Sequence, residues 1–288
     1  MKRLTLLVAT AIICTTASAQ NEEPKNPKTD TIRIGGMIIV KNGDNKRGLH
    51  INVGGHNSNR KKSKISTNWF VLDLGFSNYI DKTSYATAGS YLVNRPGFPA
   101  IDKNDFKLRA GKSVNVNIWL FMQQVNLVKH YVSLKYGLGL ELNNYRYKSA
   151  ISYKEKGTVP YSIIPTLTNS PFIFRDSVSF SKNKLAADYL TVPLMLNFAS
   201  RHANINKGVS LGLGVSVGYL YSERNKQKSA DRGKHTNKGD YDLQRFKFAY
   251  QAELGLGPIH LYGSYSPTSI YKHSMDIRPF TVGIRFSN

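Results

Sequence analysis

Two neighbouring segments, residues 185–199 and 208–223, carry apolar side chains at every second position. The apolar positions of the first are Leu190, Val192, Leu194, Leu196 and Phe198. Those of the second are Val209, Leu211, Leu213, Val215, Val217 and Tyr219, with Gly or Ser between them. A period of two is the period of a β-strand. Each segment is long enough for the roughly 9–11 tilted residues that carry a strand across a bilayer, so we predict a transmembrane hairpin.

The same alternation recurs in six further segments, which brings the number of predicted strands to eight. Their ranges are 68–77, 112–125, 132–143, 246–256, 259–266 and 278–286. Long and short connections alternate along the chain, with the brief connection 272–275 as an exception; the long ones are 81–111, 149–183 and 224–240. Outer-membrane barrels combine long outer loops with short periplasmic turns. The predicted fold is all-β: an eight-stranded antiparallel up-and-down transmembrane barrel over residues 68–288, with both termini in the periplasm.

Two details of the strands carry local predictions. Several aromatic residues fall near the outer strand ends, where an aromatic girdle is expected. They are Tyr145, Tyr147, Tyr219, Tyr221, Phe246 and Tyr271. Pro193 interrupts an otherwise regular strand, and proline has no N–H to donate to a sheet. We therefore predict a β-bulge at Pro193.

The N-terminal region has a different composition from the barrel. Residues 1–19 combine a basic start, a short apolar run and Ala17-Ser18-Ala19, which is typical of a cleaved secretory signal. Residues 20–67 follow as a predicted appendage. It starts as a leader rich in charge and proline, continues with short strands at 31–40 and 49–55, and ends in a basic connector.

The chain is strongly basic, with a formal net charge of +22 that falls to +20 without Lys2 and Arg3. For an exported barrel, anionic lipid head groups and sugar phosphates fit this charge better than nucleic acid, which is not expected as a partner. Lipopolysaccharide contact is predicted for Arg95, Lys103, Lys107, Arg109 and Lys112. A second basic group in one predicted loop consists of Lys226, Lys228, Arg232, Lys234 and Lys238.

Six charged residues share the interior parity of their strands. They are Asp73, Lys135, Glu141, Lys247, Glu253 and Arg285. An eight-stranded barrel is just wide enough for side chains to fill it. We therefore predict a structural network of ion pairs in the lumen, with Asp73 and Arg285 meeting where the first and last strands close the barrel. A diffusion pore is not expected.

Sequence motifs for catalysis or cofactor binding are missing. The one cysteine, Cys14, lies in the predicted signal, the seven histidines lack metal-ligand spacing, and no Gly-x-Ser-x-Gly element occurs. No cofactor, metal site or catalytic residue is predicted, and the protein is expected not to be an enzyme. A lipid-modifying enzyme with residues drawn from separate loops remains an alternative, because local motifs do not detect one.

Three stretches carry a family resemblance. They are residues 187–198 with the sequence ADYLTVPLMLNF, the glycine-alternating residues 208–221, and residues 279–286 with the sequence PFTVGIRF. The chain resembles the PorT-like outer-membrane β-barrel family of Bacteroidetes over roughly residues 68–288. The resemblance implies an outer-membrane location and a link, in some members, to protein secretion.

The expected function is therefore structural or interactive. The barrel would contact outer-membrane lipid and lipopolysaccharide, and secretion or envelope proteins. The main alternative is a soluble barrel that binds an apolar ligand, as lipocalins do. Alternation alone does not tell which face of a strand points outward.

Overall fold

In the computed structural model the chain divides into two compact units, Met1–Lys61 and Lys62–Asn288. The structure describes residues 64–128, 131–200, 208–257, 259–273 and 275–286, and the backbone of 29–34, 37–42 and 50–52. The first unit contains an antiparallel sheet in the order β1 (Thr29–Ile34), β2 (Met37–Asn42) and β3 (His50–Asn52). The predicted signal at residues 1–19 lies outside the described residues.

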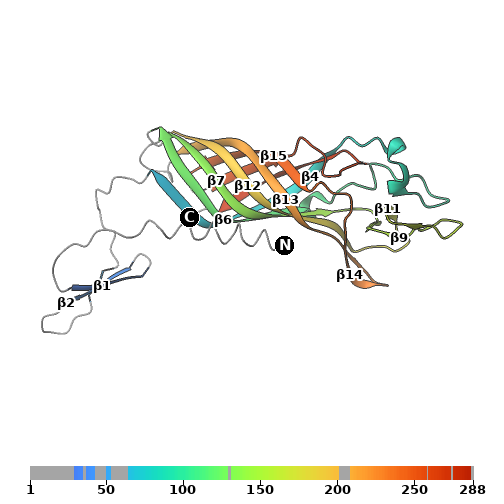
Figure 1. The fold of residues 1–288 in the computed structure, drawn as a ribbon, viewed down its shortest axis with the longest axis horizontal. Helices are drawn as coiled ribbons and strands as arrows, with labels where there is room; N and C mark the ends of the chain where they lie inside the picture. The colour runs from blue at the N-terminus through green and yellow to red at the C-terminus, as the bar shows by residue number, and fades with distance from the viewer. Residues whose placement is uncertain are drawn as a thin grey trace. The chain divides into compact units, whose positions relative to one another are not determined.

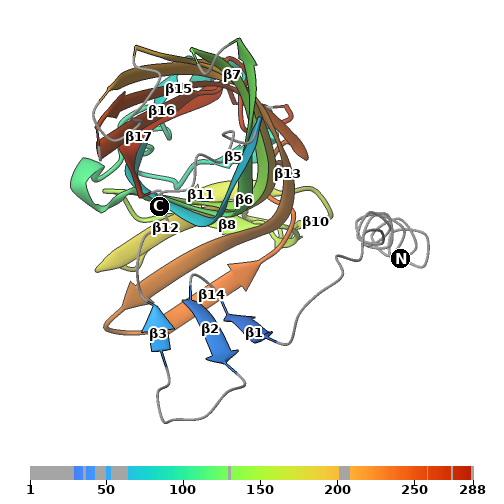
Figure 2. The same ribbon diagram turned by 90° about the vertical axis from the view of Figure 1, so that its left-hand side faces the viewer.

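Eight long strands of the second unit form a closed antiparallel ring. They are β4 (Ile65–Asp81), β6 (Val114–Val128), β7 (Val132–Arg146), β12 (Lys182–Ala199), β13 (Val209–Ser229), β15 (Phe246–Leu256), β16 (Ile259–Tyr265) and β17 (Ile277–Phe286). Each strand pairs with its neighbours along the chain, and β17 pairs with β4 to close the ring. Figure 2 shows this ring from the end. The predicted all-β antiparallel barrel is confirmed.

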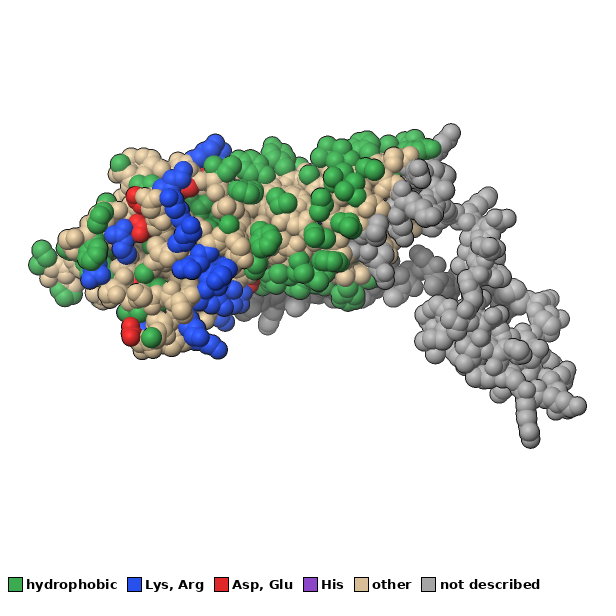
Figure 3. Space-filling view, turned by 180° about the vertical axis from the view of Figure 1, so that it is seen from behind, with side chains coloured by type: hydrophobic (Ala, Val, Ile, Leu, Met, Phe, Trp, Pro, Cys, Tyr) green, Lys and Arg blue, Asp and Glu red, His purple; other side chains and the backbone are tan. Residues whose placement is uncertain are grey.

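The apolar positions of the strands point outward. Val282 and Ile284 are 59% and 42% exposed, whereas Thr281 before them and Arg285 after them are buried. Figure 3 shows hydrophobic side chains spread over the surface of the barrel on the face that it draws. A soluble barrel with an apolar ligand needs the opposite facing, so the lipocalin-like alternative is wrong. Among the described residues, no helix has the length and apolarity of a membrane span.

The long connections fold into a cap at one end of the barrel (Figure 1). One small sheet has the order β5 (Leu92–Val93), β11 (Phe172–Arg175) and β8 (Ile151–Lys154), and β9 (Gly157–Thr158) pairs with β10 (Leu167–Thr168). Three short 3-10 helices are η1 (Tyr85–Thr87), η2 (Gly89–Tyr91) and η3 (Ala110–Lys112). The predicted loop 224–240 is instead a hairpin, because β13 runs on to Ser229 and pairs with β14 (Gly233–Lys238).

The cap has its own apolar core, which contains three residues of the predicted aromatic girdle. Tyr145, Tyr147 and Tyr271 are all at most 3% exposed and belong to one buried cluster. For these three the girdle prediction is wrong, because their side chains pack into the core of the cap and do not face outward. Tyr219 and Phe246 do point outward, with ring centroids 5.4 Å apart.

Pro193 causes no bulge. It stays in register opposite Ser216 of β13, and on the β7 side the pairing skips Val192 and Pro193 and resumes at Leu194 without a shift. The missing N–H therefore removes local pairing on one side but leaves the facing of the strand unchanged. The register shifts lie elsewhere, between Asp188 and Tyr189 on β12 and at two places on β6.

Candidate functional site

The lower part of the barrel interior contains four of the predicted lumen charges in contact. Arg285 of β17 donates two hydrogen bonds to Asp73 of β4, at 2.7 and 2.8 Å. The same guanidinium forms an ion pair with Glu253 of β15, which accepts a second ion pair from Lys135 of β7 at 2.7 Å. His260 Nδ1 lies 3.2 Å from the Glu253 carboxylate. The four charges form one continuous chain across the lumen.

Neutral side chains complete this layer. Trp119 Nε1 donates to Asp73 at 2.7 Å, and Asn117 donates to the same carboxylate oxygen at 3.1 Å. The Arg285 guanidinium lies 5.6 Å from the Trp119 ring and 5.9 Å from the Tyr262 ring. Asp73 and Arg285 are both at most 2% exposed. Buried charges are tolerated when they are paired and hydrogen-bonded, as they are here.

A second layer contains the remaining two predicted charges. Lys247 of β15 pairs with Glu141 of β7, and both are buried. Glu141 also accepts hydrogen bonds from Asn143 at 2.9 Å and Thr191 at 3.3 Å. Strands β7 and β15 are not neighbours, because β12 and β13 lie between them in the ring. The Lys135–Glu253 and Lys247–Glu141 pairs therefore bridge the lumen at two levels.

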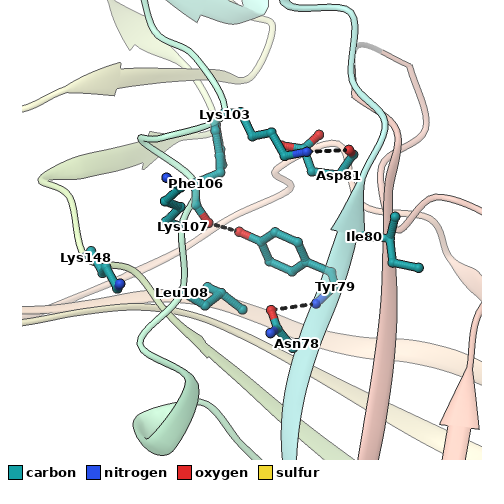
Figure 4. Close-up of a pocket in the computed structure, with 9 residues that line it drawn as sticks. All are labelled: Asn78, Tyr79, Ile80, Asp81, Lys103, Phe106, Lys107, Leu108 and Lys148. Carbon is teal, nitrogen blue, oxygen red and sulfur yellow. Dashed lines mark hydrogen bonds between the residues drawn. The ribbon is translucent and has the colours of Figure 1, made fainter.

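The predicted basic contact residues do not form one cluster. Lys103 and Lys107 lie together, with Lys148, around a pocket of about 280 Å³ beside the end of β4 that enters the cap. Figure 4 shows Tyr79 in the centre of this pocket, donating a hydrogen bond to the Phe106 carbonyl, and Lys103 reaching the Asp81 carbonyl. Three lysines and one carboxylate, that of Asp81, are thus among the residues that line the pocket.

The other three residues of that prediction lie elsewhere. The Arg95 guanidinium stacks 4.4 Å from the centroid of the Phe98 ring in the cap. Arg109 directly precedes η3, and Lys112 is the last residue of η3. In the second predicted group, Lys226 and Lys228 belong to β13 and Lys234 and Lys238 to β14. Arg232 pairs instead with Asp176 at 2.9 Å.

Sequence reasoning missed four cations that share the face of the second group. They are Arg146, Lys182, Lys184 and Arg224. Arg224 has the opposite parity to the outward residue Tyr221 of its strand and reaches this face through the register shift between Asp188 and Tyr189. For the other three the signal was present, because each continues the outward parity of its strand beyond the apolar positions. It was overlooked because those strands were expected to end near the membrane surface.

Groups with catalytic potential are sparse in the part of the chain that the structure describes. No set of His, Cys, Asp and Glu side chains there is arranged to hold a metal ion. His273 Nδ1 lies 2.8 Å from Asp242 Oδ1 at the cap surface, and the histidine side chain is 78% exposed. The backbone N–H of His273 also donates to Asp242 Oδ2, at 3.1 Å.

The comparisons with known proteins agree with the barrel. A family model described as "Outer membrane protein beta-barrel domain" matches residues 86–286. The chain belongs to this family. The family description supports a location in the outer membrane. No curated protein matches the chain.

Two solved structures are similar at low identity. Ail, the attachment invasion locus protein of Yersinia pestis, is 13% identical, with 76% of this chain and 98% of that chain covered and a TM-score of 0.30. The same protein in complex with the heparin analogue sucrose octasulfate is 12% identical, with the same coverage and a TM-score of 0.27.

Proposed function

We propose that this member of the outer-membrane barrel family is a non-enzymatic interaction protein, in which a closed barrel holds a folded external cap. The observation that carries this proposal is the pair of ion pairs that join β7 to β15 across the lumen. Side chains that bridge the interior at two levels block the diffusion of solutes through the lumen. Such a barrel is suited to anchoring the cap in the membrane. The charges serve a structural role.

The surface of the cap supports an interaction role. The β9–β10 hairpin ends in Ile163, Ile164 and Leu167, which are 101%, 74% and 79% exposed. Large apolar side chains grouped at an exposed tip often mark a protein contact. The resemblance of the 187–198 strand to PorT-like proteins of Bacteroidetes favours a secretion or envelope protein as the partner.

The orientation belongs to the same proposal. The cap faces the outside, both termini of the barrel face the periplasm, and residues 20–67 lie on the periplasmic side. This is the arrangement that an even number of strands with long outer connections adopts. Lipopolysaccharide is the lipid partner on the outer side. Of the residues predicted to contact it, Lys103 and Lys107 lie together at the pocket.

Two measurements test the proposed role. In planar bilayers the purified protein should give no steady channel conductance, and a stable open channel would contradict the filled lumen. In intact cells, chemical crosslinking should capture a partner protein that is lost with Ile163→Ser/Ile164→Ser and kept with the control Lys154→Gln/Lys156→Gln. These two lysines are exposed and lie in or just after β8. Equal capture by both variants would contradict an interaction through the tip.

A further inference from the structure

A band of Lys and Arg side chains lies between the apolar surface of the barrel and the outer end of the cap (Figure 3). On the outward face of β7, β12, β13 and β14 the structure places eight cations, which we term the cation ladder. Its members are Arg146, Lys182, Lys184, Arg224, Lys226, Lys228, Lys234 and Lys238. The alternate residues of these segments, such as Asn183 and Asn225, are buried in the cap, so the cations point the other way.

Cations of the ladder lie directly opposite one another on paired strands. On β12 and β13, Lys184 faces Lys226 and Lys182 faces Lys228. Arg146 of β7 also faces Lys184, from the other side. The β13–β14 hairpin repeats the arrangement, with Lys228 facing Lys234 and Arg224 facing Lys238. Directly opposite side chains in an antiparallel pair are only about 4.5–5.5 Å apart at Cβ, and like charges there destabilise the sheet.

Carboxylates of the protein do little to neutralise this charge. Among the described residues, Arg224 alone of the eight forms an ion pair, with Asp188. Arg146 and Lys184 bind neutral oxygens, those of Ser181 and Asn144. The buried Nε atoms of Arg146 and Arg224 have no hydrogen-bond partner in the described part of the chain. Each of these two guanidinium groups thus has one N–H group that no described residue accepts.

Lys184 lies at the centre of the ladder and beyond the apolar belt, where its burial and the mutual repulsion of these cations affect its pKa. Burial, and after it the neighbouring charges of Lys182, Lys226, Arg224 and Arg146, lower the pKa of Lys184 to about 8. A lysine whose positive charge is disfavoured to this degree gains strongly from an added anion. The ladder therefore has the properties of a binding surface whose counter-charge comes from outside the chain.

The height of the ladder identifies the source of that anion. On β13 the outward apolar residues run from Val209 to Tyr221, and Arg224 is the next outward cation. Twelve residues at about 3.3 Å each, tilted by about 45°, rise about 30 Å, which is the thickness of the hydrocarbon core. Arg224 and the cations above it are consequently level with the head groups of the outer leaflet. An anion at that level is part of a lipid.

We propose that the cation ladder binds the phosphate groups of a phosphorylated saccharide lipid in the outer leaflet, with Lys184 and Lys226 at its centre. The guanidinium groups of Arg146 and Arg224 supply the planar donors that suit phosphate oxygens. This site is distinct from the pocket at Lys103 and Lys107. It rests on the proposed function in one respect, the outward orientation of the cap.

The test uses the full-length protein in neutral detergent and three probes: bis-phosphorylated lipid A, its dephosphorylated form, and inorganic pyrophosphate. Bis-phosphorylated lipid A should bind and raise the unfolding temperature, and the other two should not. Lys184→Gln/Lys226→Gln should weaken that binding about 30-fold, because each cation near an anionic surface contributes about 1 kcal/mol. Lys154→Gln/Lys156→Gln is the matched control and should bind as the unchanged protein does.

A second readout separates binding from folding. Without lipid, Lys184→Gln/Lys226→Gln should unfold at the same or a higher temperature, because it removes facing like charges. A lower temperature would overturn the proposal, as would equal binding of the two lipid A forms or an equal response to pyrophosphate. The detergent assay does not depend on orientation. Protease treatment of intact cells, which should cut cap tips and leave periplasmic turns intact, tests the orientation separately.

Discussion

Asp73 and Arg285 lie directly opposite each other at the seam that closes the barrel, 212 positions apart in the chain and joined by two hydrogen bonds of 2.7 and 2.8 Å. The pair links β4 to β17, the first and last strands of the ring. Because Arg285 also pairs with Glu253, its guanidinium neutralises two carboxylates at once. Asp73 has other donors in Trp119 and Asn117.

Because of this asymmetry, substitutions at Arg285 and Asp73 should lower the free energy of unfolding by different amounts. Arg285→Gln leaves two buried carboxylates with Lys135 as their remaining cation, and should lower the free energy of unfolding by about 3–5 kcal/mol. Asp73→Asn leaves Arg285 paired with Glu253 and should cost less. The double variant should recover part of the loss. The measurement is a double-mutant cycle on the unfolding midpoint of the detergent-folded protein, followed by gel mobility.

Arg278→Gln is the matched control for this cycle. Arg278 lies on the same strand and pairs with Asp276 at 2.8 Å, but both side chains are partly exposed. Exposed ion pairs contribute about 0–1 kcal/mol, so the control should change stability little. Strictly additive effects of Asp73→Asn and Arg285→Gln would show that the two residues do not interact at the seam.

The seam also contains two facing glycines whose size should matter. Gly75 lies opposite Gly283, and a Cβ on Gly75 would come within 2.6 Å of the Val282 carbonyl and 2.5 Å of the Tyr262 hydroxyl. Gly75→Ala should therefore push the closing strands apart and cost about 1–3 kcal/mol. Gly263→Ala is the control, because its nearest neighbour would be 3.6 Å away. Equal unfolding midpoints for the two variants would contradict the close approach of β4 and β17.

These two cases show why the barrel could be predicted from the sequence. A strand that separates lipid from a packed interior must alternate, so the pattern from Leu72 to Phe76 or from Phe280 to Phe286 marks both the strand and its facing. Up-and-down topology then requires the first and last strands to pair. The contact between Asp73 and Arg285 follows from parity and from distance to the chain ends.

The cap could not be predicted in the same way. Its core draws single residues from distant connections, such as Phe106, Tyr153, Tyr241 and Ile270, with no local period. The cation ladder was missed for a related reason. Lys182 was assigned to the connection 149–183, and Lys184 was left just before the predicted strand 185–199. The strand pairing that sets them opposite Lys228 and Lys226 is a long-range property.

Glu223 should make folding stability depend on pH. It faces the cap interior beyond the apolar belt, accepts a hydrogen bond from the Tyr241 N–H at 3.1 Å, and has its pKa raised to about 7, chiefly by burial and then by Asp240. Because this pKa lies above the ordinary value of about 4.3, the folded protein keeps a proton that the unfolded chain has lost. The contribution of Glu223 to stability is therefore greatest below about pH 4 and is lost as the pH rises to about 7.

The comparison of Glu223→Gln with the unchanged protein isolates this effect. The substitution removes the titration, so the unchanged protein should lose about 1–2 kcal/mol relative to the variant between pH 4.5 and 7.5, allowing for solvent screening of a half-buried group. Unfolding midpoints at the two pH values give the difference. Parallel pH profiles would show that Glu223 ionises normally in the folded cap.

Tyr153 should contribute to the stability of the cap but not to that of the barrel. Its side chain is fully buried, and its hydroxyl lies 2.6 Å from that of Tyr147 and 2.8 Å from that of Tyr271. Tyr153→Phe leaves these neighbours with one partner fewer and should cost about 1–2 kcal/mol. Tyr153→Ala also removes a ring that packs 5.4 Å from Tyr241, and should cost about 3–5 kcal/mol within the cap.

The cap and the barrel share strands β7, β12 and β13, but this substitution should affect the stability of the cap alone. The ion pairs of the lumen lie below the tyrosine cluster and do not contact Tyr153. Tyr153→Ala should expose cap segments to limited proteolysis while the trypsin-resistant barrel keeps its heat-modifiable gel mobility. Ile163→Ala, at a fully exposed tip, is the control and should change neither. If the barrel of Tyr153→Ala lost its mobility shift at the temperature at which the cap opens, cap and barrel would fold as one cooperative unit, and the cap would not be a module that the barrel displays.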